Sequence, residues 1–355
     1  MSPRRIGTAA AVLGALVWAG TLGSGFVYDD HTYVVNNADL RGGLPRVPEL
    51  FTHAFPSQAP ERGLYRPVTA VSLWMDRAPG GAVSPFRHHL TNLFLAAGAV
   101  LAAWLALSRI LPPPAAAVGA LLFAVHPVHA EAVAWVTGRS ELLATIFGGA
   151  SFALLVDAGR GRGGAGRMMS GAALLFLGML SKENAAVALP LAATALAVTD
   201  GTRRGSAAGA LVAGTLAVVA ASALKVAAVG SFGPTAGETV GPGSLAARLP
   251  LAVAATGEHL RLLWLPVPLH LERMARPPGA WTAPAVLAGA GWLLAWAAVA
   301  AAVRRHRPAL LLVAWPLVAL LRVMHLIPIG DTVAERFLVI PSIGTCGLLA
   351  WALTA

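Results

Sequence analysis

The chain has 355 residues, of which 57% are hydrophobic and only 12% are charged, and its mean hydropathy is +0.69. This composition excludes a soluble globular domain and indicates a polytopic membrane protein. A formal charge of +10 would suggest nucleic acid as the partner of a soluble protein, but here the arginines lie in short connectors between apolar runs, so we expect no nucleic-acid partner.

Ten apolar runs are candidates for membrane helices, and together they predict an all-α bundle of about 10 spans. We interpret the first run as an uncleaved helix, because no small-x-small cleavage site follows it. We expect residues 168–199 to form two short helices or a re-entrant pair broken at 181–184, since both flanks are basic. The ten runs are 6–24, 90–110, 114–128, 140–157, 168–181, 185–199, 206–229, 283–303, 308–328 and 338–355.

The basic connectors predict the orientation of the bundle. All of them fall on one side when these spans are counted, and the positive-inside rule assigns that side to the cytoplasm. Of the 16 acidic residues, only Asp157 and Asp200 then lie on the cytoplasmic side. The chemistry is therefore expected on the extracytoplasmic face.

Two large loops are predicted on that face, 25–88 and 230–282. The second contains an apolar stretch with Arg and Glu, 248–265, which predicts an interfacial helix. We expect residues 1–355 to form one transmembrane domain. Lysine is scarce while arginine, alanine and glycine abound, and this composition points to a GC-rich bacterial genome. For a bacterial protein of this class we expect the inner membrane as its location.

Asp29 and Asp30 follow the first span directly, where a membrane helix gives way to the long polar loop. Two neighbouring carboxylates repel each other, so one of them holds its proton more tightly, and such a group suits a base that accepts a proton from a hydroxyl. The alternative is a solvated helix end. We prefer Asp30 as the base, because it is one residue further from the span.

A second polar group follows the third span. His126, His129 and Glu131 are candidates for an acceptor site or a metal site, since histidines three residues apart with a nearby carboxylate can bind a metal. Arg139 follows shortly after and is a candidate ligand of a donor phosphate. The alternative for the whole group is anchoring at the membrane interface.

Further charges lie at the ends of later apolar runs. Lys182, Arg322 and Arg336 are additional candidates for binding a donor phosphate, since ionisable residues at membrane helices are costly and usually functional. Glu183 and Glu335 are supporting residues that can also form local ion pairs with their neighbours. Tyr65 and Arg66 precede Pro67, which is expected to start an interfacial helix in the first loop.

Seven short strings occur in order along the chain: FVYDD at 26–30, YRP at 65–67, HHLTN at 88–92, FAVHPVHAEAV at 123–133, GRSELLA at 138–144, LSKEN at 180–184 and AERFLVIPSIG at 334–344. This series resembles the membrane region of the transmembrane and tetratricopeptide-repeat O-mannosyltransferases. The resemblance implies a GT-C glycosyltransferase fold, a multi-span helical bundle with a large first extracytoplasmic loop.

The resemblance also implies an activity. Such enzymes take a sugar, typically mannose, from a polyprenyl-phosphate carrier and deliver it with inversion to Ser or Thr hydroxyls on the extracytoplasmic face. Asp29 and Asp30 correspond to the acidic pair presumed to be catalytic in the family. In a bacterium, the donor lipid would carry an undecaprenyl-type phosphate, and the acceptor would be an exported protein or another hydroxyl compound. No cofactor is required, and a divalent metal held by Glu131 or the aspartates is an alternative.

The tetratricopeptide repeats expected beyond the membrane region are absent from this chain, which ends in an apolar run. Either the chain is a fragment or its acceptor is selected in another way. Two other functions stay open at this point: a transporter or flippase for lipid-linked sugars, and an inactive membrane scaffold. Transporters usually place ionisable groups near the bilayer midplane, whereas the acids here are nearly confined to one face.

Overall fold

The computed structural model describes residues 3–77, 82–231, 244–271, 273, 278–327 and 330–355. Parts of both predicted loops, 78–81, 232–243 and 274–277, lie outside the described residues. Within the described part the structure is helical, and its one β-bridge is isolated and joins Arg273 to Val333.

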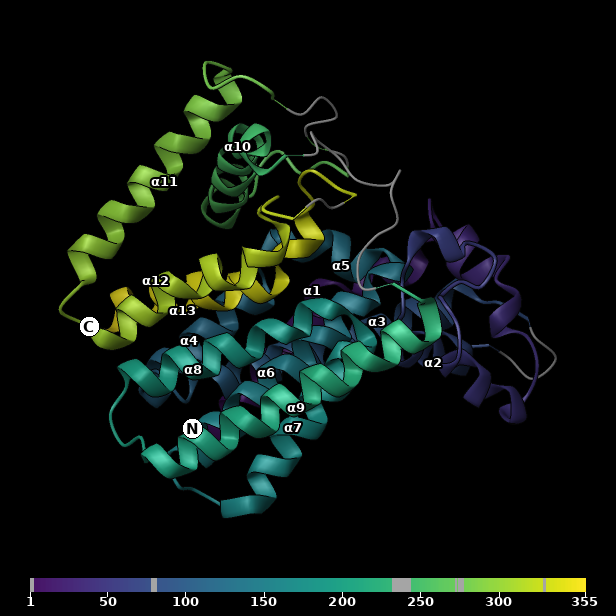
Figure 1. The fold of residues 1–355 in the computed structure, drawn as a ribbon, viewed down its shortest axis with the longest axis horizontal. Helices are drawn as coiled ribbons and strands as arrows, with labels where there is room; N and C mark the ends of the chain where they lie inside the picture. The colour runs from purple at the N-terminus through teal and green to yellow at the C-terminus, as the bar shows by residue number, and fades with distance from the viewer. Residues whose placement is uncertain (1–2, 78–81, 232–243, 272, 274–277, 328–329) are drawn as a thin grey trace.

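Helices make up the architecture (Figure 1), and several of them have proline in the first turn, where its missing N–H costs no hydrogen bond. The α-helices are α1 (Pro3–Val17), α2 (Pro67–Met75), α3 (Pro85–Leu107), α4 (Pro113–Ala124), α5 (Ala130–Ala134), α6 (Arg139–Gly159), α7 (Gly164–Ser181), α8 (Ala188–Val198), α9 (Arg204–Val229), α10 (Leu245–Trp264), α11 (Pro284–Val303), α12 (Arg307–Leu320) and α13 (Val339–Thr354). Short 3-10 or π turns are η1 (Ala19–Gly23), η2 (His31–Val35), η3 (Ala38–Leu40), η4 (Leu44–Phe51), η5 (Pro60–Arg62), η6 (Pro127–His129), η7 (Val136–Gly138), η8 (Glu183–Val187), η9 (Leu321–Val323) and η10 (Glu335–Leu338).

The structure confirms an all-α membrane protein but not the count of about 10 spans. Six helices of the described chain are long and apolar enough to cross a membrane, or seven if the bent pair Pro113–Ala124 and Pro127–Ala134 counts as one span. Each predicted run does contain a helix, but α8 has 11 residues and α12 has 14. At 1.5 Å per residue these helices are shorter than the hydrocarbon layer of about 30 Å.

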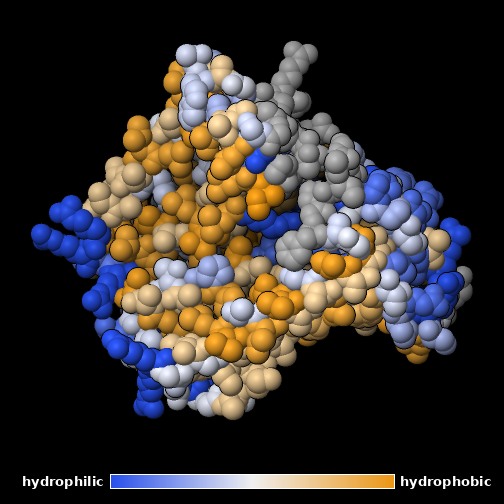
Figure 2. Space-filling view, viewed as in Figure 1, coloured by the Kyte–Doolittle hydropathy of each residue, from blue (hydrophilic) through white to orange (hydrophobic). Residues whose placement is uncertain are grey.

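An apolar belt separates two polar ends of the molecule, and Figure 2 shows it as an orange band between blue surfaces. At one end the connectors after α3, α6, α8 and α11 meet, as expected from the basic connectors, and Arg109, Arg160, Arg162 and Arg307 line one hollow there. The other end carries the first loop, coloured purple in Figure 1.

Helix α6 lies inside the bundle, with 78% of its apolar window buried against α3, α7, α9 and α13. The helix expected at 248–265 corresponds to α10, which packs on α11 where Gly257 meets the backbone of Gly289. One side of α10, including Leu251 and Ala255, is buried in the main core of the bundle.

The first loop is folded and has a small core of its own. Tyr33, Leu40, Phe55 and Leu73 are buried together with Val136 of η7. The expected helix after Tyr65 and Arg66 is α2, which begins at Pro67. Because Val136 belongs to the segment that leads into α6, this small core fixes the first loop on the bundle beside the entrance of α6.

Candidate functional site

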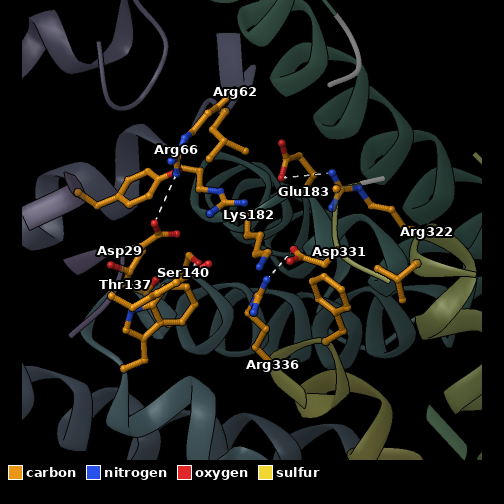
Figure 3. Close-up of a pocket in the computed structure, with 18 of the residues that line it drawn as sticks. Asp29, Arg62, Arg66, Thr137, Ser140, Lys182, Glu183, Arg322, Asp331 and Arg336 are labelled. Carbon is orange, nitrogen blue, oxygen red and sulfur yellow. Dashed lines mark hydrogen bonds and ion pairs between the residues drawn. The ribbon is translucent and has the colours of Figure 1, made fainter. Parts of the chain in front are cut away.

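A cavity of about 540 Å³ lies where the first loop, the start of α6, the break after α7 and the segment before α13 meet. Figure 3 shows side chains from all of these segments pointing into it. Among the described residues, its walls carry more positive than negative charge. The lining cations are Arg62, Arg66, Lys182, Lys225, Arg273, Arg322 and Arg336, and the lining acids are Asp29, Glu183 and Asp331.

Asp29 lies on the wall formed by the first loop. Its side chain is 28% exposed, and the nearest cation in an ion pair is Arg62, with an N···O distance of 3.6 Å. Tyr28 precedes it with a φ of 50°, an uncommon backbone conformation for a bulky residue, and such strained residues gather at functional sites. Asp29 is thus held on the cavity with its carboxylate only loosely paired.

Tyr33 stands beside this carboxylate on the same wall. Its hydroxyl accepts a hydrogen bond of 2.8 Å from Arg62. A tyrosine phenol is protonated at neutral pH, and burial raises the pKa of the Tyr33 phenol further, so it is available as a hydrogen-bond donor.

Asp30 has different surroundings. Its side chain is completely buried and accepts hydrogen bonds from the Thr137 N–H at 2.9 Å, the Thr137 hydroxyl at 2.8 Å and the Val27 N–H at 3.1 Å. It does not line the cavity. The two bonds from Thr137 tie the first loop to η7, and the bond from Val27 closes a turn within the loop. Of the two predicted aspartates, Asp29 therefore faces the cavity and Asp30, the sequence-based preference for the base, does not.

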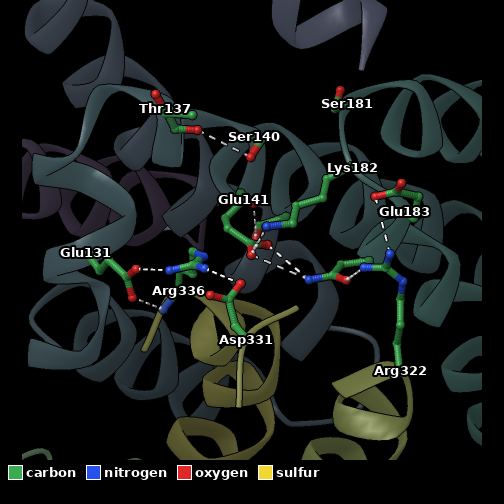
Figure 4. Close-up of polar contacts among 12 residues, drawn as sticks. Glu131, Thr137, Ser140, Glu141, Ser181, Lys182, Glu183, Arg322, Asp331 and Arg336 are labelled. Carbon is green, nitrogen blue, oxygen red and sulfur yellow. Dashed lines mark hydrogen bonds and ion pairs between the residues drawn. The ribbon is translucent and has the colours of Figure 1, made fainter. Parts of the chain in front are cut away.

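Lys182 reaches the cavity from the break between α7 and η8. Its Nζ contacts the Glu141 carboxylate at 2.5 Å, and Asn184 donates to the same carboxylate at 3.3 Å (Figure 4). Glu141 is buried, so this ion pair lies under the floor of the cavity. Removing one partner of such a buried pair leaves the other charge uncompensated.

A cluster of cations surrounds Glu183 on another wall. Lys225 contacts its carboxylate at 2.9 Å and Arg322 at 3.7 Å, while Arg322 also donates to Asn184 at 3.0 Å. Arg66 lines the same cavity, and its Nε is buried with no hydrogen-bond partner among the described residues. Three cations thus surround one carboxylate, and this leaves an excess of positive charge.

Arg336 forms the wall before α13. It pairs with Glu131 and, at 2.6 Å, with Asp331, and its guanidinium lies 5.4 Å from the ring centre of Trp135. Glu335 lies behind the wall, where it binds Arg273 at 2.8 Å. Glu131 and Glu335 do not line the cavity, so each acts by positioning an arginine that does.

Several predicted site residues lie away from the cavity. Arg139 is fully buried and joins α2 to α3 by contacting Asp76 at 2.6 Å, Asn92 at 3.0 Å and the His88 carbonyl at 2.9 Å. It is therefore a structural tie and cannot reach a donor phosphate in this geometry. The Tyr65 hydroxyl likewise has another partner, because it donates a hydrogen bond of 2.8 Å to the Phe51 carbonyl.

The two histidines proposed for an acceptor or metal site also have other partners. A ring nitrogen of His126 is 3.1 Å from the Leu263 carbonyl, and one of His129 is 2.9 Å from the Ser342 hydroxyl. Neither lines the cavity, and no three His, Cys, Asp or Glu side chains gather into a metal-binding group in the described part of the chain. These histidines connect α4 and η6 to α10 and α13.

Sequence reasoning missed Arg62, Lys225 and Arg273 among the lining cations. Lys225 carried a usable signal, because it is a charged residue within an apolar span, and the chain has only one other lysine, Lys182. Arg62 and Arg273 lie in polar loops, where charged residues are common, so the sequence carries no signal that marks them as functional.

Searches with the sequence found relatives with one common description. The chain is 34% identical to the protein O-mannosyl-transferase Tmtc2 of Drosophila melanogaster over 139 residues, which cover 38% of this chain and 15% of the fly protein. It is 36% identical to human protein O-mannosyl-transferase TMTC4 over 140 residues, or 34% of this chain and 19% of the human protein.

The longest of these alignments is with a protein O-mannosyl-transferase of Caenorhabditis elegans, 34% identical over 188 residues, which cover 51% of this chain and 26% of the worm protein. The matched part of the chain thus spans about a quarter or less of each relative. No family model and no solved structure matches the chain significantly. Over the matched residues, the chain is therefore similar to the TMTC proteins named O-mannosyl-transferases, as the ordered strings of its sequence predict.

Proposed function

We propose that this chain forms the catalytic membrane region of a GT-C type glycosyltransferase. It would transfer a hexose, mannose by analogy with the names of its relatives, from a polyprenyl-phosphate carrier to a hydroxyl acceptor on the extracytoplasmic face. One observation carries the proposal. A loosely paired carboxylate, Asp29, faces a cavity that seven cations of the described chain line at the edge of an apolar belt.

The donor phosphate fits the wall formed by Arg66, Lys225 and Arg322. Arginine forks and a lysine ammonium match phosphate oxygens, and Glu183 offsets only part of their charge. The same segments carry apolar side chains on the outer surface: Leu224 of α9 and Leu321 of η9 are both exposed. A lipid tail along this surface can therefore remain in the bilayer while its phosphate enters the cavity.

The reaction follows from the position of Asp29. Its carboxylate accepts the proton of the acceptor hydroxyl, and the acceptor oxygen forms a bond to the anomeric carbon of the sugar. The bond between that carbon and the phosphate oxygen breaks, and the electron pair leaves with the polyprenyl phosphate. A single displacement from the opposite face inverts the anomeric centre.

The cations on the opposite wall stabilise the phosphate as its charge grows. Groups that are already oriented toward developing charge are effective where water is scarce, because they need no reorganisation. Tyr28, Tyr33 and Trp135 provide aromatic surface and hydroxyl groups on the side of Asp29, where the sugar and the acceptor would lie. No step of this mechanism requires a metal.

The substitution Asp29→Asn tests the proposal. A positioned general base contributes about 10²–10⁴-fold to a rate, so we expect sugar transfer in purified protein to fall at least about a hundredfold. Binding of the donor lipid and thermal stability should stay near wild type, since among the described residues the Asp29 carboxylate has a single, long ion pair of 3.6 Å to lose. Transfer is measured with a polyprenyl-phosphate mannose donor and a Ser/Thr peptide.

The matched control is Glu49→Gln, which removes one carboxylate from an exposed position of the same loop. Undiminished transfer by Asp29→Asn would reject the catalytic assignment. Sugar-lipid movement across vesicles without transfer to any hydroxyl would support the flippase alternative instead.

A further inference from the structure

A second hollow, of about 270 Å³, lies at the end of the molecule opposite the candidate active site. The two hollows are separated by α6: Ser140 at its start lines the first, and Arg160 directly after its end lines the second. At 1.5 Å per residue the 21 residues of α6 span about 30 Å, the thickness of a hydrocarbon layer. The second hollow therefore lies at the opposite boundary of the apolar belt.

Positive charge predominates around this second hollow. Its lining includes four arginines, Arg109, Arg160, Arg162 and Arg307, against one acid, Asp200. The four connectors that supply these residues are far apart in the sequence, so the fold itself gathers the charges. Like charges repel when they are brought together, so such a cluster is stabilised by an anion.

The nearby acids do not neutralise the cluster. Asp157 is buried and already pairs with Arg109 at 2.9 Å, Arg167 at 3.1 Å and Arg162 at 3.9 Å. Arg160 forms no ion pair of its own with a described acid: it donates to the Thr199 hydroxyl at 2.9 Å, and its Nε is buried without a hydrogen-bond partner in the described structure.

The remaining acid can be displaced at little cost. Asp200 pairs with Arg307 at 3.2 Å, but its side chain is 95% exposed, and an ion pair in such a position contributes little to stability. An entering phosphate could therefore take over Arg307 while also reaching the guanidinium of Arg160. Ile110, Val198 and Pro308 line the same hollow and give it an apolar part.

We propose that this hollow binds the phosphate group of an anionic phospholipid headgroup. The ligand chemistry is a phosphate anion held by two or more arginines, and the source is a lipid, because the hollow opens at headgroup depth between membrane helices. Basic pockets in this position are a recurrent way of binding anionic lipids. The site is independent of sugar transfer and stands whether or not the proposed reaction is correct.

The test measures binding of phosphatidylglycerol and phosphatidylcholine to the purified full chain in detergent by native mass spectrometry. Wild-type protein should retain phosphatidylglycerol and not phosphatidylcholine. The double variant Arg160→Gln/Arg307→Gln should bind phosphatidylglycerol about 30-fold more weakly, since each arginine near an anionic headgroup contributes about a kcal/mol. The single variant Arg162→Gln, at an exposed position, serves if the double variant does not fold.

The matched control is Arg304→Gln/Arg305→Gln, which removes two exposed charges from the same end of the molecule outside the hollow. This control should bind phosphatidylglycerol as the wild type does. If both double variants bound phosphatidylglycerol equally weakly, the binding would depend on general surface charge and not on the hollow, and the proposal would be overturned. Displacement of the lipid by millimolar inorganic phosphate would overturn it too, and would identify free phosphate as the ligand.

Discussion

Asp29 and Asp30 are neighbours in the chain, yet their carboxylates have opposite surroundings. Asp29 faces the cavity and Asp30 is completely buried against Thr137. Their position after the first span predicts that the two carboxylates are functional. Which of them is buried depends on where η7 lies, and η7 comes more than 100 residues later in the chain. No local pattern contains that information.

Replacing the buried Asp30 should mainly lower the stability of the protein. Asp30→Ala leaves the buried N–H and hydroxyl groups of Thr137 without their acceptor, and an unsatisfied buried donor costs about 1–3 kcal/mol. We expect a clear loss of thermal stability in detergent, together with a loss of activity because Asp29 is no longer held in place. Asp29→Ala should leave the melting temperature nearly unchanged.

A double-mutant cycle with Thr137→Val checks the cause. Thr137→Val removes the hydroxyl that donates to Asp30 and keeps the backbone N–H, so its effect on the free energy of unfolding and that of Asp30→Ala should be less than additive. Additive effects would mean that the two residues act separately, contrary to the structure.

For the arginines too, the sequence does not distinguish a structural residue from one that lines the cavity. Arg139 and Arg336 both lie near helix ends in the sequence and were equally good candidates for a donor phosphate. Arg139 proves to be fully buried among Asp76, Asn92 and the His88 carbonyl, whereas Arg336 lines the cavity. Burial decides between the two, and burial depends on helices distant in sequence.

At the scale of elements, apolar runs and prolines predict where helices lie but not how many of them cross the membrane. Each of the ten runs contains a helix, and the expected break after Ser181 occurs between α7 and η8. The runs at 185–199 and 308–328, however, form α8 and α12, which are short helices. Hydrophobicity alone does not distinguish a span from a short helix packed inside a bundle.

The contact between α10 and α11 depends on two glycines. A Cβ atom at Gly257 would meet the backbone of Gly289, so Gly257→Ala must push the helices apart. Overpacking of this kind costs about 1–3 kcal/mol, and we expect a lower melting temperature in detergent. The wall that carries Arg273 should also be disturbed, because its partner Glu258 belongs to α10.

Gly291→Ala is the matched control, since a Cβ at this position of α11 meets no atom within 4 Å. It should leave the stability unchanged or raise it slightly, because alanine has a higher helix propensity than glycine. Equal destabilisation by both variants would contradict the close contact at Gly257.

For the whole molecule, the apolar belt and the two polar ends set the arrangement in a membrane (Figure 2). The basic end carries the arginine-rich connectors, and the positive-inside rule predicts that it faces the cytoplasm. The cavity with Asp29 would then open on the extracytoplasmic side, as the proposed function requires.

Single cysteines test this orientation in intact cells. The native Cys346 is buried, so the wild-type background should be nearly unreactive. A membrane-impermeant maleimide should label Glu49→Cys in the first loop and spare Arg162→Cys at the basic end. Both variants should be labelled after lysis. Labelling of Arg162→Cys alone in intact cells would show that the protein has the opposite orientation in the membrane.

The sequence by itself determined the class of protein, the position of most helices and the similarity to O-mannosyl-transferases, because hydrophobic runs, prolines and short ordered strings are local properties. The tertiary structure alone decided which charges act together. Arg62, Lys182, Lys225, Arg273 and Arg336 come from separate segments and meet only when the bundle is packed. An ionisable group is functional or structural according to its burial and partners, and both depend on residues far away in the chain.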